Sequence, residues 1–159
     1  MKTNTKYIVM VCIIAVALAV DLITKQVFAD IEYIRIIPFL IAFQTNGGNT
    51  GAAFGIFSKS TTFLIVVSIV IVLCLVFVDL MLKIKTKVYT IGFSLIVAGA
   101  VGNFIDRIML GYVRDFIMFD FWKTFPIFNF ADCCIVIGAV LMCVHFIFLS
   151  KKADSNGKN

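Results

Sequence analysis

Hydrophobic residues fall into four long blocks along the chain, separated by shorter segments of mixed polarity. The blocks run from about 7 to 29, 61 to 82, 88 to 109 and 131 to 149. A helix of roughly 20 apolar residues is long enough to cross the hydrocarbon core of a bilayer. Because unpaired backbone groups are costly in lipid, each block is predicted to be a transmembrane helix.

The two longer connecting segments, 30–58 and 110–130, have a different pattern. Two runs in the first of them, Tyr33–Ile37 and Phe39–Gln44, are rich in residues that favour β-structure and predict short strands. A glycine-rich stretch follows them and predicts a tight turn that brings the backbone close to a ligand. The second segment is semi-apolar and rich in phenylalanine, as expected at a membrane interface.

Composition agrees with a membrane protein. Apolar types make up 62% of the 159 residues and charged types 14%, whereas soluble domains carry about 25% charged residues. The length suits one catalytic domain, predicted at 1–150, followed by a polar and disordered tail at 151–159. The first block is expected to be a retained helix, because its apolar run exceeds a signal peptide and no small-x-small site follows it.

The net charge of +5 comes largely from lysines near the ends of the hydrophobic blocks. These lysines are Lys2, Lys6, Lys83, Lys85, Lys87, Lys151, Lys152 and Lys158. All of them fall on one side of a four-helix serpentine, so the positive-inside rule predicts that both termini are cytoplasmic. The segments 30–58 and 110–130 are then expected to face outward, and no nucleic-acid partner is expected.

The cysteines and the single histidine do not suggest a metal site. The five cysteines all lie in apolar segments and none has C-x-x-C spacing, so we expect small buried side chains and neither a metal nor a disulfide. His145 lies deep in the fourth block and is expected to be packed there, with no partner for zinc. No cofactor is predicted.

Polar residues cluster at the predicted outward ends of the helices. An ionisable residue inside a span costs at least ~2.5 kcal/mol, so such residues need partners or a cavity. The residues concerned are Asp21, Lys25, Asn103, Asp106, Arg107, Asp115, Asn129 and Asp132. Four separate regions thus place polar groups at one depth of the membrane, and a shared site is the simplest explanation.

Spacing allows both a functional and a structural interpretation of these residues. Asp21 and Lys25 are four apart on one helix face, and they form either part of the site or a snorkelling surface pair. Asn103 shares a face with Asp106 and Arg107, which is also compatible with an interhelical polar clamp.

The fourth block opens with two residues that suit a helix start. Asn129 is compatible with a helix cap, and Asp132 would favour the helix dipole.

Asp132 has a second possible role if its carboxylate faces that of Asp115. Two facing carboxylates tend to share one proton. One can then take a proton from water while the other polarises a carbonyl and protonates the leaving amine. The pair therefore predicts an aspartic peptidase.

Two other functions remain as alternatives. A small transporter would carry charges along the full depth of the bundle, whereas block 61–82 is almost uncharged. A non-catalytic membrane scaffold gives no reason for carboxylates at Asp115 and Asp132.

Five motifs occur in order and span nearly the whole chain. They are Asp21–Lys25, Asn49–Gly55, Gly102–Arg107, Val113–Ile117 and Phe128–Asp132. Together they resemble the bacterial lipoprotein signal peptidases. The resemblance implies an all-α membrane fold of four transmembrane helices, with a small extracytoplasmic β-cradle between helices 1 and 2.

The resemblance also implies a site. The catalytic dyad would be Asp115 and Asp132. Residues that bind substrate or shape the site would be Asp21, Lys25, Asn49, Gly51, Asn103, Asp106, Arg107 and Asn129. Two features depart from the family: the glycine pair Gly47-Gly48, and Cys133-Cys134, which places thiols beside the dyad.

Substrates and surroundings follow from the same resemblance. They would be prolipoproteins with a diacylglyceryl cysteine, cut on its N-terminal side in the bacterial cytoplasmic membrane. The enzyme would need no metal, contact membrane lipids, act as a monomer and bind globomycin-like inhibitors.

Overall fold

The computed structural model describes residues 1–45, 48–50 and 61–149. Its helices are α1 (Thr3–Val27), α2 (Thr61–Leu82), α3 (Lys87–Leu110) and α4 (Phe130–Val144), and a π-helical turn at His145–Leu149 extends α4. In the described part of the chain, four helices are long and apolar enough to cross a membrane. The four predicted spans are therefore confirmed, although α1 begins earlier than predicted, at Thr3.

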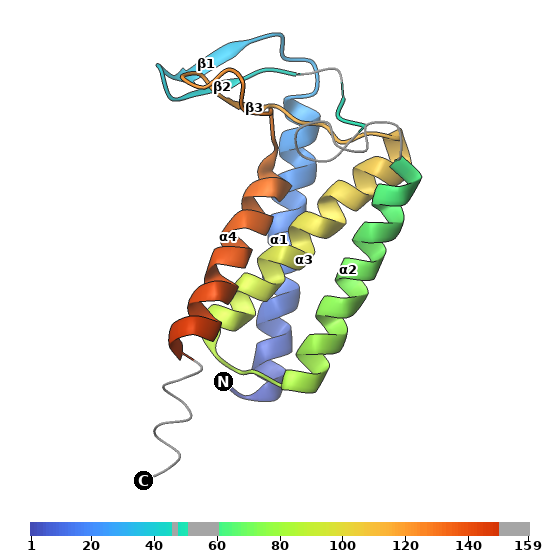
Figure 1. Cartoon of the computed structure of the whole chain (residues 1–159), viewed down its shortest axis with the longest axis vertical. Helices are drawn as coiled ribbons and strands as arrows, with labels where there is room; N and C mark the ends of the chain where they lie inside the picture. The colour runs from blue at the N-terminus through green and yellow to red at the C-terminus, as the bar shows by residue number, and fades with distance from the viewer. Residues whose placement is uncertain (46–47, 51–60, 150–159) are drawn as a thin grey trace.

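Helix α3 is the centre of the bundle and contacts each of the other three helices (Figure 1). In its most apolar stretch 56% of the residues are buried, against 11% for α2. Glycines allow α3 to approach α4 closely: a Cβ on Gly99 would overlap the Ala131 carbonyl, and one on Gly92 would lie 2.9 Å from the Gly138 carbonyl oxygen. Small residues at such contacts are typical of membrane helices.

A small antiparallel sheet caps one end of the bundle, which we call the sheet end (Figure 1). Its strands are β1 (Ile34–Ile37), β2 (Ile41–Phe43) and β3 (Ile117–Phe119), in that order. The first two strands were predicted, but β3 was not. It comes from the segment between α3 and α4, where Met118 pairs with Ala42 of β2.

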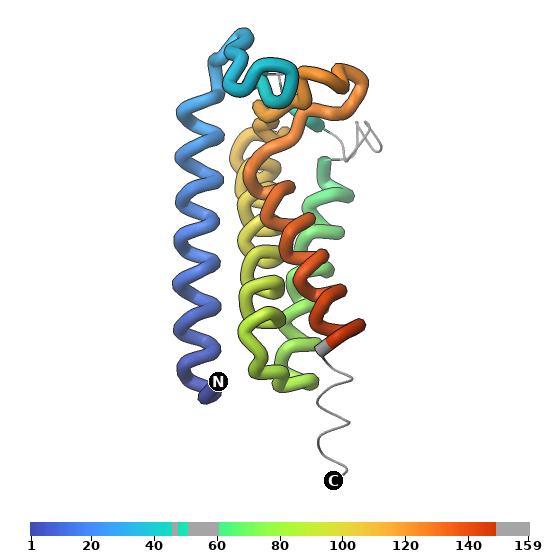
Figure 2. The backbone as a smooth tube through the Cα atoms, turned by 90° about the vertical axis from the view of Figure 1, so that its left-hand side faces the viewer, coloured from blue at the N-terminus to red at the C-terminus, as the bar shows by residue number. Residues whose placement is uncertain are grey.

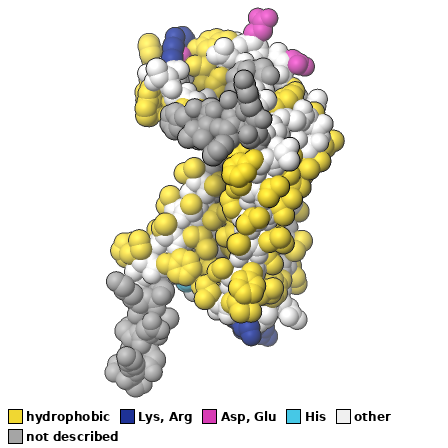
Figure 3. Space-filling view, turned by 45° about the vertical axis from the view of Figure 1, so that its right-hand side comes forward, with side chains coloured by type: hydrophobic (Ala, Val, Ile, Leu, Met, Phe, Trp, Pro, Cys, Tyr) yellow, Lys and Arg dark blue, Asp and Glu magenta, His cyan; other side chains and the backbone are white. Residues whose placement is uncertain are grey.

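The opposite end of the bundle, which we call the far end, is where α1 begins and α4 finishes (Figure 2). Between the two ends, the helices expose large apolar side chains over most of their length (Figure 3). Exposed apolar side chains on a helix bundle of this length are expected to face lipid. The sheet end is therefore held at one membrane surface, where aqueous and lipid groups meet.

Aromatic packing joins the sheet to α1. The Phe28 ring, just after α1, lies 4.6 Å from the Phe43 ring of β2 and 5.0 Å from the Phe116 ring, centroid to centroid. Phe116 also pairs through its backbone, because its N–H donates to the Phe128 carbonyl and its carbonyl accepts from Gln44. These backbone hydrogen bonds also fix the position of the preceding residue, Asp115, relative to the helix bundle.

Candidate active site

The two predicted catalytic aspartates come from different elements at the sheet end. Asp115 lies in the segment between α3 and β3, and its side chain is buried. That segment is anchored on one side of Asp115 by an antiparallel bridge between Val113 and Asn49. Asp132 lies in the first turn of α4. A loop residue and a helix residue are thus brought together.

Asn129 connects the two aspartates directly. Its Nδ2 donates to Asp115 Oδ1 at 2.6 Å, and its Oδ1 accepts from the Asp132 backbone N–H at 3.0 Å. The Asn129 backbone N–H donates in turn to Asp132 Oδ2 at 3.1 Å, which completes a capping box. The predicted helix cap is therefore confirmed, and the same side chain, 0% exposed, also holds Asp115.

Two further amides complete the contacts of the pair. Asn49 Nδ2 donates to Asp115 Oδ2, and Asn103 Nδ2 donates to Asp132 Oδ1, both at 2.8 Å. Asn129 Nδ2 also donates to Asn103 Oδ1 at 3.1 Å. Each carboxylate therefore accepts two hydrogen bonds from the described residues around it, and three asparagines from three parts of the chain fix their relative position.

A buried charge network lies beneath the amides. Lys25 is 0% exposed, and its Nζ lies 2.9 Å from Asp21 Oδ2 and 3.6 Å from Asp106 Oδ2. The same ammonium donates to Asn103 Oδ1 at 3.0 Å, so the network reaches Asp132 through one amide. The interpretation of Asp21 and Lys25 as a surface pair is therefore wrong.

Asp21 also fixes the start of α4. Its Oδ1 accepts a hydrogen bond from the Ala131 backbone N–H at 2.9 Å. Gly102 makes room for this contact between α1 and α4, because a Cβ at Gly102 would overlap Asp21 Oδ2. The α1 carboxylate thus satisfies a free N–H in the first turn of α4, beside Asp132.

Arg114 is a member of the network that the sequence did not reveal. Its Nη2 donates to Asp106 Oδ1 at 2.7 Å, and its backbone N–H donates to Asp106 Oδ2 at 3.0 Å. Its Nη1 donates to Gln26 Oε1 of α1 at 3.1 Å. Arg114 directly precedes Asp115, so it ties this residue to α1 and α3. Its place inside the motif Val113–Ile117, directly before Asp115, was the available signal.

The other predicted residues are placed as follows. Arg107 donates from Nη1 to the Asn103 carbonyl at 3.5 Å and lines the cavity described below. Cys133 lines the same cavity, whereas Cys134 is buried among α1 and α3 residues. Gly51 and Gly47 lie outside the described residues.

Burial changes the acidity of one aspartate. Removal from water, and then the nearby charge of Asp132, raise the pKa of Asp115 to about 6. Hydrogen bonds from Asn49 and Asn129 act in the opposite direction and offset part of this rise. A carboxyl group with this pKa can keep its proton in mildly acidic water and give it up to a substrate.

A cavity of about 560 Å³ opens beside the pair. Its polar lining comes from Asn49, Asn103, Arg107, Asp115 and Asp132, and its apolar lining includes Phe119, Phe125, Ile127, Phe128, Ile135 and Val136. The carboxylates therefore lie in the wall of a largely hydrophobic cavity. Such a site suits a ligand with a long apolar part and a polar group at one end.

Comparison with known proteins shows the family of the chain. The family model described as "Signal peptidase (SPase) II" matches residues 13–148. The chain belongs to the signal peptidase II family. Its activity is accordingly that of a lipoprotein signal peptidase, an aspartic-type peptidase, and the transporter and scaffold alternatives are set aside.

Relatives from several bacteria agree with this membership. The chain is 39% identical over 111 residues to the lipoprotein signal peptidase of Enterococcus faecalis, covering 70% of this chain and 68% of the relative. It is 31% identical to that of Clostridium acetobutylicum over 91% of this chain and 97% of the relative. The relative from Serratia marcescens is 38% identical, with coverages of 88% and 82%.

Solved structures confirm the fold class. Two structures of a bacterial membrane enzyme are each 32% identical to this chain, with TM-scores of 0.78 and 0.79. The first covers 94% of this chain and 91% of its own, and the second 87% and 92%. The chain is a bacterial multi-pass membrane protein of four apolar helices and a small sheet.

Proposed function

We propose that Asp115 and Asp132 are the catalytic dyad of this signal peptidase. The observation that carries the proposal is Asn129, a fully buried side chain that hydrogen-bonds Asp115 while capping the helix that carries Asp132. An ordinary cap needs no second carboxylate, and burying a carboxylate costs free energy unless hydrogen bonds or an opposite charge offset it.

The surroundings of the two carboxylates support different roles. Asp132 lies in the first turn of α4 and accepts two N–H donors, which favours the negative charge of a general base. Asp115, with its raised pKa, is suited to hold the shared proton as the general acid. The pair would then differ in protonation because the two environments differ.

Hydrolysis follows from these roles. Asp132 takes a proton from a water molecule whose oxygen adds to the scissile carbonyl carbon, while Asp115 donates its proton to the carbonyl oxygen. The C–N bond then breaks as the leaving amine receives a proton from Asp132, and one hydroxyl of the tetrahedral diol returns a proton to Asp115, which restores the dyad. One water is consumed and one carboxylic acid and one amine are formed.

The substrate proposed for this site is a prolipoprotein whose cysteine carries a diacylglyceryl group, cut on the N-terminal side of that cysteine. The apolar wall formed by Phe125, Phe128 and Val136 suits the acyl chains, and the polar end of the cavity holds the dyad near the peptide bond. Family membership supports prolipoproteins as the substrate class. Globomycin-like inhibitors would occupy the same cavity, and a monomer contains all of these residues.

Orientation is proposed from charge. The lysines near the far end predict that both termini are cytoplasmic, so the dyad would face the extracytoplasmic side of the membrane. Residues 1–150 would suffice for catalysis, because every residue assigned to the site lies before residue 138. Removal of 151–159 is then expected to leave cleavage unchanged.

The test is to make Asp115→Asn and Asp132→Asn separately and measure cleavage of a synthetic diacylated lipopeptide by the purified enzyme in micelles. Each change keeps the shape of the side chain and removes proton transfer, so kcat should fall by about 10³-fold or more. Asp120→Asn is the matched control, since Asp120 is also buried at the sheet end but contacts Tyr33 and Arg35. Near-normal turnover in either dyad variant would show that the assignment is wrong.

A further inference from the structure

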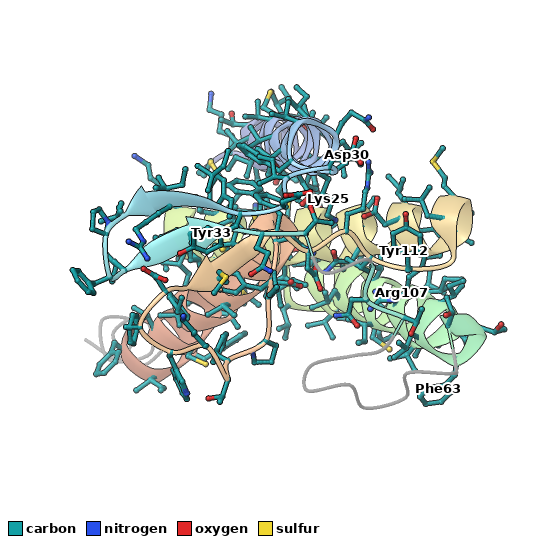
Figure 4. The ribbon with its side chains drawn as sticks, turned by 90° about the horizontal axis from the view of Figure 1, so that it is seen from above. Lys25, Asp30, Tyr33, Phe63, Arg107 and Tyr112 are labelled. Atoms are coloured by element: carbon teal, nitrogen blue, oxygen red, sulfur yellow. The ribbon has the colours of Figure 1, made fainter. Side chains whose placement is uncertain are left out.

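A second cavity, of about 300 Å³, lies on the α1 side of Asp115. Its lining includes Lys25, Ala29, Asp30, Tyr112, Arg114 and Asp115. Figure 4 shows Lys25 and Asp30 at the end of α1 and Tyr112 across from them, with Arg107 farther from α1. Asp115 lines both cavities. The two spaces therefore share Asp115, a residue of the proposed dyad, in their walls.

The linings of the two cavities differ in chemistry. Most residues around the larger cavity are aliphatic or aromatic, whereas most of those around the second one carry a charge or a hydroxyl. Water is retained in a protein where polar groups offer it two to four partners. A volume of about 300 Å³ is large enough to hold several waters.

Hydrolysis requires one water per turnover at the dyad. When acyl chains and peptide occupy the larger cavity, they displace water from it, because the wall of this cavity is largely apolar. We propose that the hydrolytic water reaches the dyad through the second cavity, so the two substrates of the reaction, peptide and water, approach Asp115 from opposite sides. This inference rests on the assignment of Asp115 and Asp132 as the dyad.

Substitution of Ala29 is expected to block this water route without changing the larger cavity. Its methyl group lines the second cavity and does not line the larger one. Ala29→Phe places a ring in the water space, so kcat should fall by about 10-fold or more while KM stays within about 2-fold. Ala29→Ser, which leaves the space open, should retain the parent kcat. Val27→Phe is the matched control, because Val27 is 62% exposed on the last turn of α1.

A compensating change separates blocked water from local distortion. Tyr112 lines the same cavity, so Tyr112→Ala in the Ala29→Phe background should reopen the space and recover kcat. If Ala29→Phe does not fold, Ala29→Cys is made instead and modified after purification with benzyl methanethiosulfonate. The modified enzyme should lose kcat and regain it on reduction, whereas the parent chain, with its native cysteines, is treated identically for comparison.

Each possible outcome either supports the proposed water route or overturns it. Reduced kcat, unchanged KM and recovery in the double variant support the water route. Unchanged kcat, a rise in KM alone, or failure of Tyr112→Ala to restore kcat overturns it. Asp115→Asn run in parallel separates the two proposals: an inactive Asp115→Asn beside a fully active Ala29→Phe overturns the route and leaves the dyad, whereas an active Asp115→Asn overturns both.

Discussion

Charged side chains are buried at both ends of the bundle, but they are organised differently. At the far end, Lys6 of α1 pairs with Asp79 of α2, and the two residues are 1% and 3% exposed. The Lys6 ammonium also lies 5.4 Å from the centroid of the Tyr89 ring. At the sheet end, Lys25 lies between Asp21 and Asp106 and reaches Asp132 through Asn103.

The difference lies in what each ion pair contacts next. The Lys6–Asp79 pair joins α1 to α2, a helix whose only other buried residue in the structure is Leu64, and it lines neither of the two cavities described above. The Lys25 network ends on a carboxylate in a cavity wall. A buried ion pair in a membrane bundle therefore only holds helices together when its contacts do not reach a site. It also positions site residues when its contacts continue to them.

The largest effect is expected from Lys25→Met. The substitution leaves Asp21 and Asp106 facing each other without their shared cation, which costs about 3–5 kcal/mol for a broken buried pair. It also removes the donor to Asn103, so cleavage should fall by at least about 100-fold even in the folded fraction. Thermal unfolding and lipopeptide cleavage in the same micelles measure both. Retained cleavage would show that the network does not position the dyad.

The far-end pair should affect stability alone. Asp79→Leu leaves the Lys6 charge buried and should lower the free energy of unfolding by about 3 kcal/mol, while kcat per folded enzyme is unchanged. Lys6→Met combined with Asp79→Leu removes both charges and should recover most of that loss. A fall in kcat in the stable double variant would contradict a purely structural role.

Arg114→Gln should lower kcat by about 10-fold with little change in KM, because it loosens the residue next to Asp115 without touching substrate contacts. Arg114→Lys should not rescue it, since an ammonium cannot reproduce the guanidinium contacts with Asp106 and Gln26. Steady-state cleavage of both variants tests this. Full activity of the lysine variant would mean that charge alone is sufficient.

The smallest effect is a shift in pH dependence. If Asp115 holds the catalytic proton, kcat/KM should fall as the pH rises through about 6. Asn49→Leu removes a hydrogen bond that lowers the pKa of Asp115, so this basic limb should move to higher pH, by a fraction of a unit. A shift to lower pH, or a flat profile, would contradict the role of Asp115 as the acid.

The same pKa predicts the direction of a stability change. The pKa of Asp115 in the folded protein, about 6, exceeds the value of about 3.9 in an unfolded chain, so the folded state binds this proton more tightly. The stabilising contribution is present below pH 4 and is lost as the pH rises towards 6. Asp115→Asn should remove this part of the pH dependence of the Tm.

The helices could be predicted from the sequence because lipid permits few alternatives. A block of apolar residues in a bilayer becomes a helix whatever its neighbours do. Strand β3 was not predicted, because its structure depends on a neighbour. The three residues Ile117–Phe119 become a strand only because β2 lies beside them. Its pattern alone is equally typical of an interfacial aromatic segment.

The site shows the same division. Spacing identified Asn129 as a cap because the N-cap pattern is local, but its contact with Asp115 depends on how the α3–α4 segment folds back. The pairing of Asp21 with Lys25 followed from helix periodicity, whereas their burial depends on α3 and α4. Lys6 was grouped with the terminal lysines, and its partner, 73 residues away, has no sequence signal.

The double role of Asn129 has a consequence for the order in which the enzyme becomes active. Helix α4 follows α1, α2 and α3 in the chain, and Asp115 gains its amide contact from Asn129 only when the first turn of α4 is formed and docked. With Asp115 and Asp132 as the proposed dyad, the three helices that precede α4 are therefore expected to have no peptidase activity until α4 has docked on them.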